Sequence, residues 1–385
     1  MIKVLHLGKY YPPDPGGIEY VLKNLLQATG FRFENHAVVA CKGPRHSEEN
    51  GPDGTVYRRK EIGTLFLTPI IPGLFLFLLS LRRREKFDCI VLHAPNPMTA
   101  AALFVSCLFL PLREKLVIYY HGDILVDAAL HRLAYFLFRP IENWTLGRAD
   151  RIVATSPNQA GFSGNLMMHA GKVTVIPLMV PDDWSDTTEE EREEARKIRE
   201  RFGAPMALFV GRLVAYKGLS TLVDAAPMVP RGTFLIVGDG PLEADLKKRA
   251  AERGVEDRLI FLGRAPDLKP YYLACDLLVL PSASAVEMFG LVQLEAMSFG
   301  KPAVTSDLTT GVTYANLDGK TGLTFPVGNS GKLAEALNNL FTDDPLRKRL
   351  GEFAGERVRK EFRSSVVGEK FVRLVQDLCG KGTPA

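Results

Sequence analysis

The first half of the chain alternates short apolar runs with segments in which apolar residues recur every three or four positions. The run 4–7 reads as a strand, and a turn rich in Pro and Gly follows it. In the next segment, 18–26, apolar residues return at helical spacing. Further strands are predicted at 36–41, 89–93, 116–120 and 151–155. Strands that alternate with helices are typical of a parallel α/β sheet.

The same pattern restarts in the second half. A proline-containing linker spans 177–186, and the charged segment 189–201 predicts a helix with a solvated face. A new strand, 206–211, then opens a second α/β unit. Its later strands are predicted at 234–237, 259–262, 277–280 and 303–305, and helices at 331–341 and 345–378. We therefore expect two Rossmann-like halves, with a ligand site facing the carboxyl ends of their strands.

Composition narrows the class of protein. The 385 residues are 46% hydrophobic and 24% charged, which is ordinary for a soluble globular protein. The five cysteines are scattered and form no C-x-x-C, which indicates a reducing compartment and argues against a disulfide framework or zinc cluster. No signal-peptide pattern precedes the first predicted strand.

The charge is small and unevenly placed. The net charge is +4. The residues through 185 hold 20 Lys and Arg against 16 Asp and Glu, so the positive and negative charges after residue 185 are equal in number. A value this small does not predict a nucleic-acid partner. It permits a locally basic surface that faces anionic lipid or an acidic substrate.

Two glutamates frame a predicted helix start. Glu287 lies in a loop that ends at Gly290, and Glu295 lies more than a turn inside the helix that follows. Unpaired backbone N–H groups at such a start suit oxygen-rich ligands, and the carboxylates could accept hydrogen bonds from sugar and ribose hydroxyls. The alternative is a solvated helix with two surface acids, and spacing alone favours that alternative.

Basic residues and glycines follow two other predicted strands. Arg212 and Lys217 come after the strand 206–211, where they could clamp a diphosphate, and this strand-end position favours function over two surface cations. Gly16 and Gly17 end the first strand–helix turn. Glycines there would let a ligand approach the backbone, and a tight turn without a ligand explains them equally well.

Histidines stand at two predicted strand ends. His121 follows the strand 116–120, where it could hydrogen-bond a ligand or move protons. His93 ends the predicted strand 89–93 and is a second candidate to line the crevice. No pair of histidines has metal-ligand spacing. Gly238 and Gly240 begin a dinucleotide fingerprint but lack its third glycine, so we interpret them as a strand–helix turn.

A run without charge spans 62–81 and ends in three arginines. Prolines and Gly73 break it, which leaves a helix over 73–84 that is too short to span a bilayer. One interpretation is a partly buried helix. The other is an interfacial helix that dips apolar side chains into lipid and meets anionic headgroups with its arginines. The residues of this second interpretation are Leu74, Phe75, Phe77, Leu78, Arg82, Arg83 and Arg84. An apolar helix at 98–112, followed by Arg113 and Lys115, could add to the same surface.

Together, these features resemble the retaining glycosyltransferase family 4, which has the GT-B fold. The resemblance covers nearly the whole chain in order. It rests on the Pro-Gly-Gly turn at 15–17, the segments 87–97, 121–123, 149–157 and 172–177, the Gly-Arg-Leu and Tyr-Lys-Gly motifs at 211–218, the segment 236–241, the spaced glutamates at 287 and 295, and the segments 300–302 and 321–323. One departure is visible at 178–182, where the family often has Gly followed by Val or Ile and Asp or Asn. We therefore expect hinge geometry or acceptor contacts to differ there.

The resemblance implies roles for matching positions. Arg212 and Lys217 would hold the donor diphosphate, and Gly16 and Gly17 would close over it. Glu295 would bind the ribose. Glu287 would bind the donor sugar together with the backbone amides of Phe289, Gly290 and Leu291, and His121 would contact that sugar near the reacting centre. His121 and Glu287 are thus the expected catalytic residues, and the loop at Gly263 and Arg264 would face the base. The family reacts with retention and without an established covalent nucleophile, a required metal or another cofactor.

The resemblance also sets the expected organisation and partners. Residues 1–185 would form an acceptor-binding domain, 186–360 a donor-binding domain, and 361–385 a helix that returns to the first domain across an interdomain cleft. The expected reaction moves a hexose from a nucleotide-diphosphate sugar to a lipid-linked or polysaccharide acceptor at the inner face of the cytoplasmic membrane. GDP-mannose is the favoured donor, and a UDP-hexose remains open. A GT-B sugar-nucleotide epimerase and a catalytically silent sugar-nucleotide sensor are the alternatives.

Overall fold

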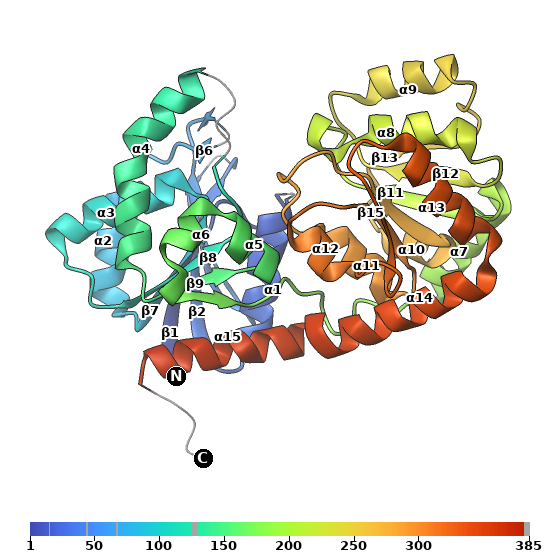
Figure 1. Cartoon of the computed structure of the whole chain (residues 1–385). Helices are drawn as coiled ribbons and strands as arrows, with labels where there is room; N and C mark the ends of the chain where they lie inside the picture. Colours follow the sequence, from blue (N-terminus) through green and yellow to red (C-terminus); the bar gives the residue numbers. More distant parts are fainter. Residues whose placement is uncertain (15, 44, 67, 125–128, 381–385) are drawn as a thin grey trace. The chain divides into compact units, whose positions relative to one another are not determined.

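The computed structural model describes residues 1–14, 16–43, 45–66, 68–124 and 129–380, and these form two compact units. The first unit comprises Met1–Met179 and the segment from Ser364 onward; the second is Val180–Arg363. Each unit is an α/β fold built on a largely parallel sheet (Figure 1).

The first unit contains an eight-stranded sheet in the order β10-β9-β8-β7-β1-β2-β4-β3. Only β3 runs antiparallel to its neighbour. The strands are β1 Ile2–Leu7, β2 Phe33–Cys41, β3 Ser47–Gly51, β4 Gly54–Lys60, β7 Cys89–Ala94, β8 Lys115–Tyr120, β9 Arg151–Ala154 and β10 Val173–Val175; a small hairpin pairs β5 Thr64–Leu65 with β6 Thr68–Pro69. Because β1, β7 and β8 are neighbours, the residues at their carboxyl ends lie along one edge.

Helices cover both faces of this sheet, as alternation along the strands requires. Leu5 and Leu7 of β1 pack into the apolar cluster shared with α2, α3 and α4, whereas Leu22 and Leu26 of α1 cover the opposite face. The C-terminal helix α15 packs against α1 (Figure 1). The helical segments are α1 Gly17–Thr29, α2 Leu74–Glu85, α3 Pro97–Phe109, α4 Ala129–Arg148, α5 Pro157–Phe162, α6 Gly164–Met168, η1 Ala170–Lys172 and α15 Ser364–Leu378.

The second unit has six parallel strands in the order β13-β12-β11-β14-β15-β16. The strands are β11 Met206–Val210, β12 Thr233–Val237, β13 Leu259–Gly263, β14 Leu277–Leu280, β15 Ala303–Ser306 and β16 Gly322–Phe325. The helical segments are α7 Glu189–Phe202, η2 Ala215–Lys217, α8 Leu219–Ala225, η3 Ala226–Met228, α9 Glu243–Glu252, α10 Lys269–Ala274, α11 Leu291–Ser298, α12 Gly311–Ala315, α13 Ser330–Thr342, α14 Asp344–Arg357 and η4 Val358–Phe362.

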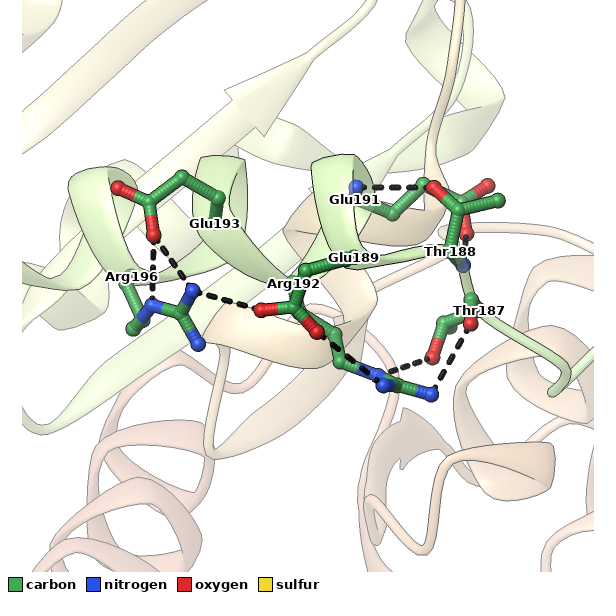
Figure 2. Close-up of polar contacts among 7 residues, drawn as sticks. All are labelled: Thr187, Thr188, Glu189, Glu191, Arg192, Glu193 and Arg196. Carbon is green, nitrogen blue, oxygen red and sulfur yellow. Dashed lines mark hydrogen bonds and ion pairs between the residues drawn. The ribbon is translucent and has the colours of Figure 1, made fainter.

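Helix α7 is the charged, solvated helix that the sequence predicts. Thr188 caps its first turn by accepting from the Glu191 backbone N–H at 3.2 Å, and the Glu191 carboxylate accepts from the Thr188 N–H at 2.6 Å. Arg192 and Arg196 pair with Glu189 at 3.3 and 2.9 Å on the exposed side (Figure 2). Only Ala195 and Ile198 are buried, so the cap and the exposed pairs add to the stability that a narrow packed face gives the helix.

Helix α2 corrects the interfacial interpretation of the apolar run. Leu74 and Leu78 are 1% and 0% exposed in the core, and Arg82 is buried with its Nε and Nη2 donating to Glu114 at 2.8 and 2.9 Å. These three side chains face the protein because α3 packs over α2, so their assignment to a lipid surface is wrong. Among the remaining members of that set, Phe75 and Phe77 are half-buried, and Arg83 and Arg84 are exposed. No helix in the described ranges combines the length and apolarity needed to cross a bilayer.

Candidate active site

The loops after β11 and β14 are joined at the carboxyl edge of the second sheet. The Ala283 N–H donates to the Tyr216 carbonyl at 2.7 Å. Gly218 begins α8 with φ at 65°, and a Cβ there would lie 2.0 Å from the Pro281 carbonyl oxygen. Only glycine satisfies both conditions. The two loops are thereby held together, and Lys217 is positioned beside the loop after β14.

Lys217 and Glu287 form an ion pair in this position. The Lys217 Nζ lies 2.6 Å from Glu287 Oε2, and the Ser282 hydroxyl donates to the same oxygen at 3.0 Å. Both charged side chains are about nine-tenths covered. Burial disfavours the ammonium, but attraction to Glu287 outweighs it and the pKa of Lys217 is raised. Lys217 therefore stays cationic at neutral pH, and the pair offers both a cation and a carboxylate to a ligand.

The segment after Glu287 is fixed at both ends. The Thr310 hydroxyl donates to the Glu287 carbonyl at 2.8 Å, and the Gly311 N–H donates to the Met288 carbonyl at 2.8 Å. Gly290 precedes α11 with φ at 70°, and a Cβ there would lie 2.5 Å from Leu280 Cδ2. These contacts set the direction of the backbone N–H groups at the start of α11.

Glu295 lies inside α11 and is 7% exposed. The Tyr272 hydroxyl donates to its Oε2 at 2.6 Å. Burial raises its pKa to about 7, against the opposing effects of that hydrogen bond and of Lys217. Because Glu287 is also only 8% exposed, the alternative of two solvated surface acids is wrong.

The other predicted donor residues lie at the same edge of this sheet. Arg212 is exposed, and no hydrogen bond or ion pair to its guanidinium occurs among the described residues. Gly263 ends β13 with φ at 69°, and its carbonyl accepts from the Gly238 N–H at 2.7 Å. The Arg264 Nε lies 2.6 Å from Asp239 Oδ2, and both groups are exposed.

The remaining predicted residues belong to the first unit. Gly16 and Gly17 are exposed at the start of α1, whereas Pro15 lies outside the described residues. His121 follows β8, and its N–H donates to the Ala94 carbonyl at 2.7 Å. The His121 side chain is 8% exposed, and burial lowers its pKa to about 3, so the ring is neutral.

Sequence reasoning missed several polar partners of these residues. Ser282, Tyr272 and Thr310 hold the two glutamates and their backbone, yet no motif sets them apart from ordinary polar residues. His6 also lacked a role, although it lies in a row with His93 and His121. Only the tertiary structure shows these contacts.

One group in the described part of the chain has the composition of a metal site. It consists of Glu34, His36 and Glu85. Lys3 lies 2.9 Å from Glu34 and 3.3 Å from Glu85, so an ammonium already balances the two carboxylates. We assign no metal to it.

The fold is that of a GT-B glycosyltransferase. Sucrose-phosphate synthase from Thermosynechococcus elongatus aligns over 99% of this chain and 100% of its own, with a TM-score of 0.79 and 22% identity. Anabaena HepE, solved in complex with UDP-glucose, aligns over 98% of this chain and 100% of its own, with a TM-score of 0.78 and 21% identity.

Sequence comparison refines this class. Residues 15–184 match the profile of Glycosyltransferase Family 4, and residues 190–357 match that of Glycosyl transferases group 1. The O-antigen chain mannosyltransferase C of Escherichia coli is 32% identical across 98% of this chain and 99% of its own. The D-rhamnosyltransferase WbpZ of Pseudomonas aeruginosa is 31% identical across 94% and 92%. The chain belongs to glycosyltransferase family 4 and is a glycosyltransferase, which confirms the resemblance drawn from its motifs.

Proposed function

We propose that this enzyme transfers a hexose, with retention, from a nucleotide-diphosphate sugar to a lipid-linked or polysaccharide acceptor in cell-surface glycan synthesis. The ion pair between Lys217 and Glu287 is the observation that carries this proposal. It places a cation and a hydroxyl-binding carboxylate together at the strand ends where a nucleotide sugar would bind. The named relatives, an O-antigen mannosyltransferase and a rhamnosyltransferase, support the class of product.

Different residues would bind the different parts of the donor. Lys217 and Arg212 would meet the diphosphate, with Gly16 and Gly17 closing over it. Glu287 and the N–H groups of 289–291 would hold the sugar, and Glu295 would accept from the ribose. The base would lie by Gly263 and Arg264, and neutral His121 would contact the sugar. Because cations and helix N–H groups can balance the diphosphate charge, we propose that no metal is required.

We propose GDP-mannose as the donor, because the relative that matches 98% of the chain is named a mannosyltransferase. A UDP-hexose is the competing possibility, since HepE was solved with UDP-glucose. Thermal shift with a panel of nucleotide sugars separates the two, because the donor that binds the folded state tightly raises the unfolding temperature most.

We propose that a surface on α3 and α4 faces an anionic membrane, in place of the α2 face given by the sequence. Each of these two helices carries exposed apolar side chains, most of them in the first half of α4, and Phe104 of α3 packs edge-on against Trp144 of α4. The exposed set, named here the α3–α4 surface, is Leu108, Phe109, Leu130, Leu133, Phe136 and Leu137. On α4 it is flanked by exposed Arg132 and Arg139, while the acid of that helix, Glu142, is buried and accepts from Tyr135. Apolar side chains with flanking arginines suit an anionic bilayer surface.

Lys217→Ala and Glu287→Ala test the donor site. We expect each to lower kcat/KM by at least about 100-fold, because a group that holds the donor near the reacting bond is lost. The matched control is Lys332→Ala with Glu335→Ala, an exposed ion pair of the same unit at 2.6 Å, which should keep wild-type turnover. Wild-type turnover in both site variants would refute the assigned roles.

Stability measurements distinguish activity lost with a functional group from activity lost because the protein unfolds. Removing one member of the pair leaves the other charge buried, whereas Lys217→Met with Glu287→Leu removes both. We expect each single variant to lose about 2–4 kcal/mol of unfolding free energy and the double variant to lose less, while all three stay inactive.

Product analysis without acceptor addresses the epimerase alternative. A transferase leaves the donor sugar unchanged, whereas an epimerase converts it. A silent sensor would bind the donor and turn over in neither assay. The transferase names of the relatives favour the first outcome.

A further inference from the structure

Three histidines from neighbouring strands form a row in the first unit. His93 Nδ1 lies 3.1 Å from His121 Nε2, and His93 Nε2 lies 3.3 Å from His6 Nδ1. The rings of His93 and His121 stack with an interplanar angle of 12°. The row follows from the parallel neighbours β1, β7 and β8: His6 pairs with Val91 and His93 with Tyr119, so each next histidine lies two residues further along the neighbouring chain segment and on the same face of the sheet.

The row is closed to solvent except at His121. His6 is 0% and His93 is 1% exposed, and Phe371 of α15 packs against the His6 ring. Burial lowers the pKa of His6 to about 3 and that of His93 well below its ordinary value. At neutral pH each ring therefore carries a single N–H.

Neutral imidazoles in a row constrain one another. Each ring has one N–H and one bare nitrogen, so each contact needs a donor on one side and an acceptor on the other. Either every ring holds its proton on Nε2 or every ring holds it on Nδ1. In the first arrangement His121 presents a bare Nδ1, and in the second it presents an Nδ1–H. No hydrogen bond within the described residues uses this Nδ1.

Asn35 decides between the two arrangements. Its Nδ2 donates to the Leu26 carbonyl at 3.2 Å and to the Thr29 hydroxyl at 3.0 Å, and that hydroxyl itself donates to the Leu25 carbonyl at 2.8 Å. Because a carbonyl only accepts, the amide cannot be reversed, and Oδ1 is left to accept.

Asn35 lies beside the inner end of the row. Asn35 Oδ1 and His6 Nε2 are both buried, and neither has a hydrogen-bond partner among the described residues. Asn35 pairs with Val4 in the sheet, so its side chain lies on the same face as His6, two residues further along β1, and interaction with the Asn35 side chain opposes the lowering of the His6 pKa by burial. An acceptor at this end favours a proton on His6 Nε2, since a bare nitrogen there would face a bare oxygen.

We propose that Asn35, His6 and His93 are positioning residues that hold His121 as its Nε2–H tautomer, so that Nδ1 accepts a hydrogen bond from a hydroxyl of the transferred sugar. The sugar contact rests on the proposed function, whereas the tautomer of the row does not. The row extends the site from the strand end of β8 to β2 without any charged group.

The tautomer is measured first, on the full wild-type chain without donor. Long-range ¹H–¹⁵N correlation with ¹⁵N-labelled histidine distinguishes Nε2–H from Nδ1–H rings. We expect Nε2–H at His6, His93 and His121. A proton on Nδ1 at any of the three would overturn the proposal, whatever the enzyme transfers.

Two substitutions at His6 then separate hydrogen bonding from packing. His6→Phe keeps a ring against Phe371 but removes both nitrogens, whereas His6→Gln keeps a donor and an acceptor but removes the ring. We expect His6→Phe to reverse the tautomer at His121 and to lower kcat about tenfold, the equivalent of roughly 1.4 kcal/mol. His6→Gln should retain more of kcat than His6→Phe. The opposite order would show that packing alone matters and would sink the positioning role.

His36→Phe is the matched control. His36 is buried on β2 and contacts Tyr57 and Glu34, outside the row. We expect it to leave kcat and the His121 tautomer unchanged. If the wild-type tautomer is as expected but no glycosyl transfer is found, the proposed function fails and the tautomer assignment stands. If His6→Phe transfers at the wild-type rate, the positioning role fails and the proposed function stands.

Discussion

Glu287 and Glu295 are the same residue type in two different states. Glu287 has the Lys217 ammonium at 2.6 Å and a serine hydroxyl at 3.0 Å, so it is one partner of an ion pair. Glu295 has a tyrosine hydroxyl as its close partner, and burial raises its pKa to about 7. Burial and the neighbouring groups together set the protonation of a buried carboxyl group, and protonation affects which ligand group the carboxyl can hold.

Glu295 makes the unfolding free energy depend on pH. Its folded-state pKa of about 7 lies above its ordinary value of 4.5, so between these values the folded state binds a proton that the unfolded state does not. The unfolding free energy should therefore fall as pH rises from about 4.5 to 7, by an amount on the order of 3 kcal/mol at most.

Glu295→Gln should remove this slope. Chemical denaturation at pH 5 and pH 8 measures it. The unfolding free energy of the wild type should be lower at pH 8 than at pH 5, and that of the variant should fall less between these two pH values. The matched control is Glu335→Gln at an exposed position of α13, which should reproduce the wild-type slope. An unchanged slope in Glu295→Gln would show that another group titrates.

Helices α2 and α4 have similar compositions but lie in different environments. Both combine leucine and phenylalanine with arginine, but Arg82 of α2 is buried against Glu114, whereas Arg132 and Arg139 of α4 are exposed. Packing by α3 turns the apolar residues of α2 inward. The exposed apolar residues of α4 have no such cover in the described structure, and Phe136 is 71% exposed.

Flotation with anionic vesicles tests the α3–α4 surface. Phe136→Ser with Leu137→Ser should lower the bound fraction of the full chain by about tenfold or more, since two large side chains no longer enter the bilayer interface. Arg132→Glu with Arg139→Glu should also weaken binding. The loss of bound fraction should be larger at low salt than at high salt, because salt screens the attraction between arginines and anionic headgroups.

The control for flotation is Leu76→Ser, an exposed leucine on α2. It should bind like wild type. Arg82→Glu is unsuitable, because it would place two carboxylates in the core and unfold the unit. Equal flotation of the α4 and α2 variants would contradict the proposed surface.

At the scale of the whole molecule, the first unit combines the segment Met1–Met179 with the described segment that starts at Ser364. Helix α15 follows the second unit in sequence but packs on α1, where Gly368 lies so close to Ala28 that an added Cβ would be 2.8 Å from the Ala28 Cβ. Phe371 of α15 is fully buried and contacts His6 and Tyr119. Helix α15 therefore completes the first unit, although it follows the second unit in sequence.

Phe371→Ala should weaken the first unit selectively. Truncating a fully buried phenylalanine costs about 3–5 kcal/mol. Hydrogen exchange should speed up in β1 and β8 while β11 and β12 keep their protection. Phe353→Ala, at a position 45% exposed on α14, is the control and should change neither. Equal loss of protection in both units would show that they unfold together.

Local pattern was enough for much of the framework. The apolar runs predicted β1, β7, β8, β9, β11, β12 and β14, because strand and helix periods are properties of neighbouring residues. The hairpin of β3 and β4 was not predicted. Its exposed Ser47–Gly51 strand and the basic end of Gly54–Lys60 lack an apolar run, and these strands form by pairing with each other and with β2.

The sequence by itself determined the alternation of strands and helices in both halves, the GT-B class and the family, since these depend on patterns and motifs along the chain. The tertiary structure decided that both glutamates are buried, that Lys217 meets Glu287 across 70 positions, that Arg82 faces inward, and that three histidines line up on separate strands. Burial and polar pairing join residues far apart in the chain, so no local pattern carries them. The roles of the predicted site residues stay predictions that the substitutions above test.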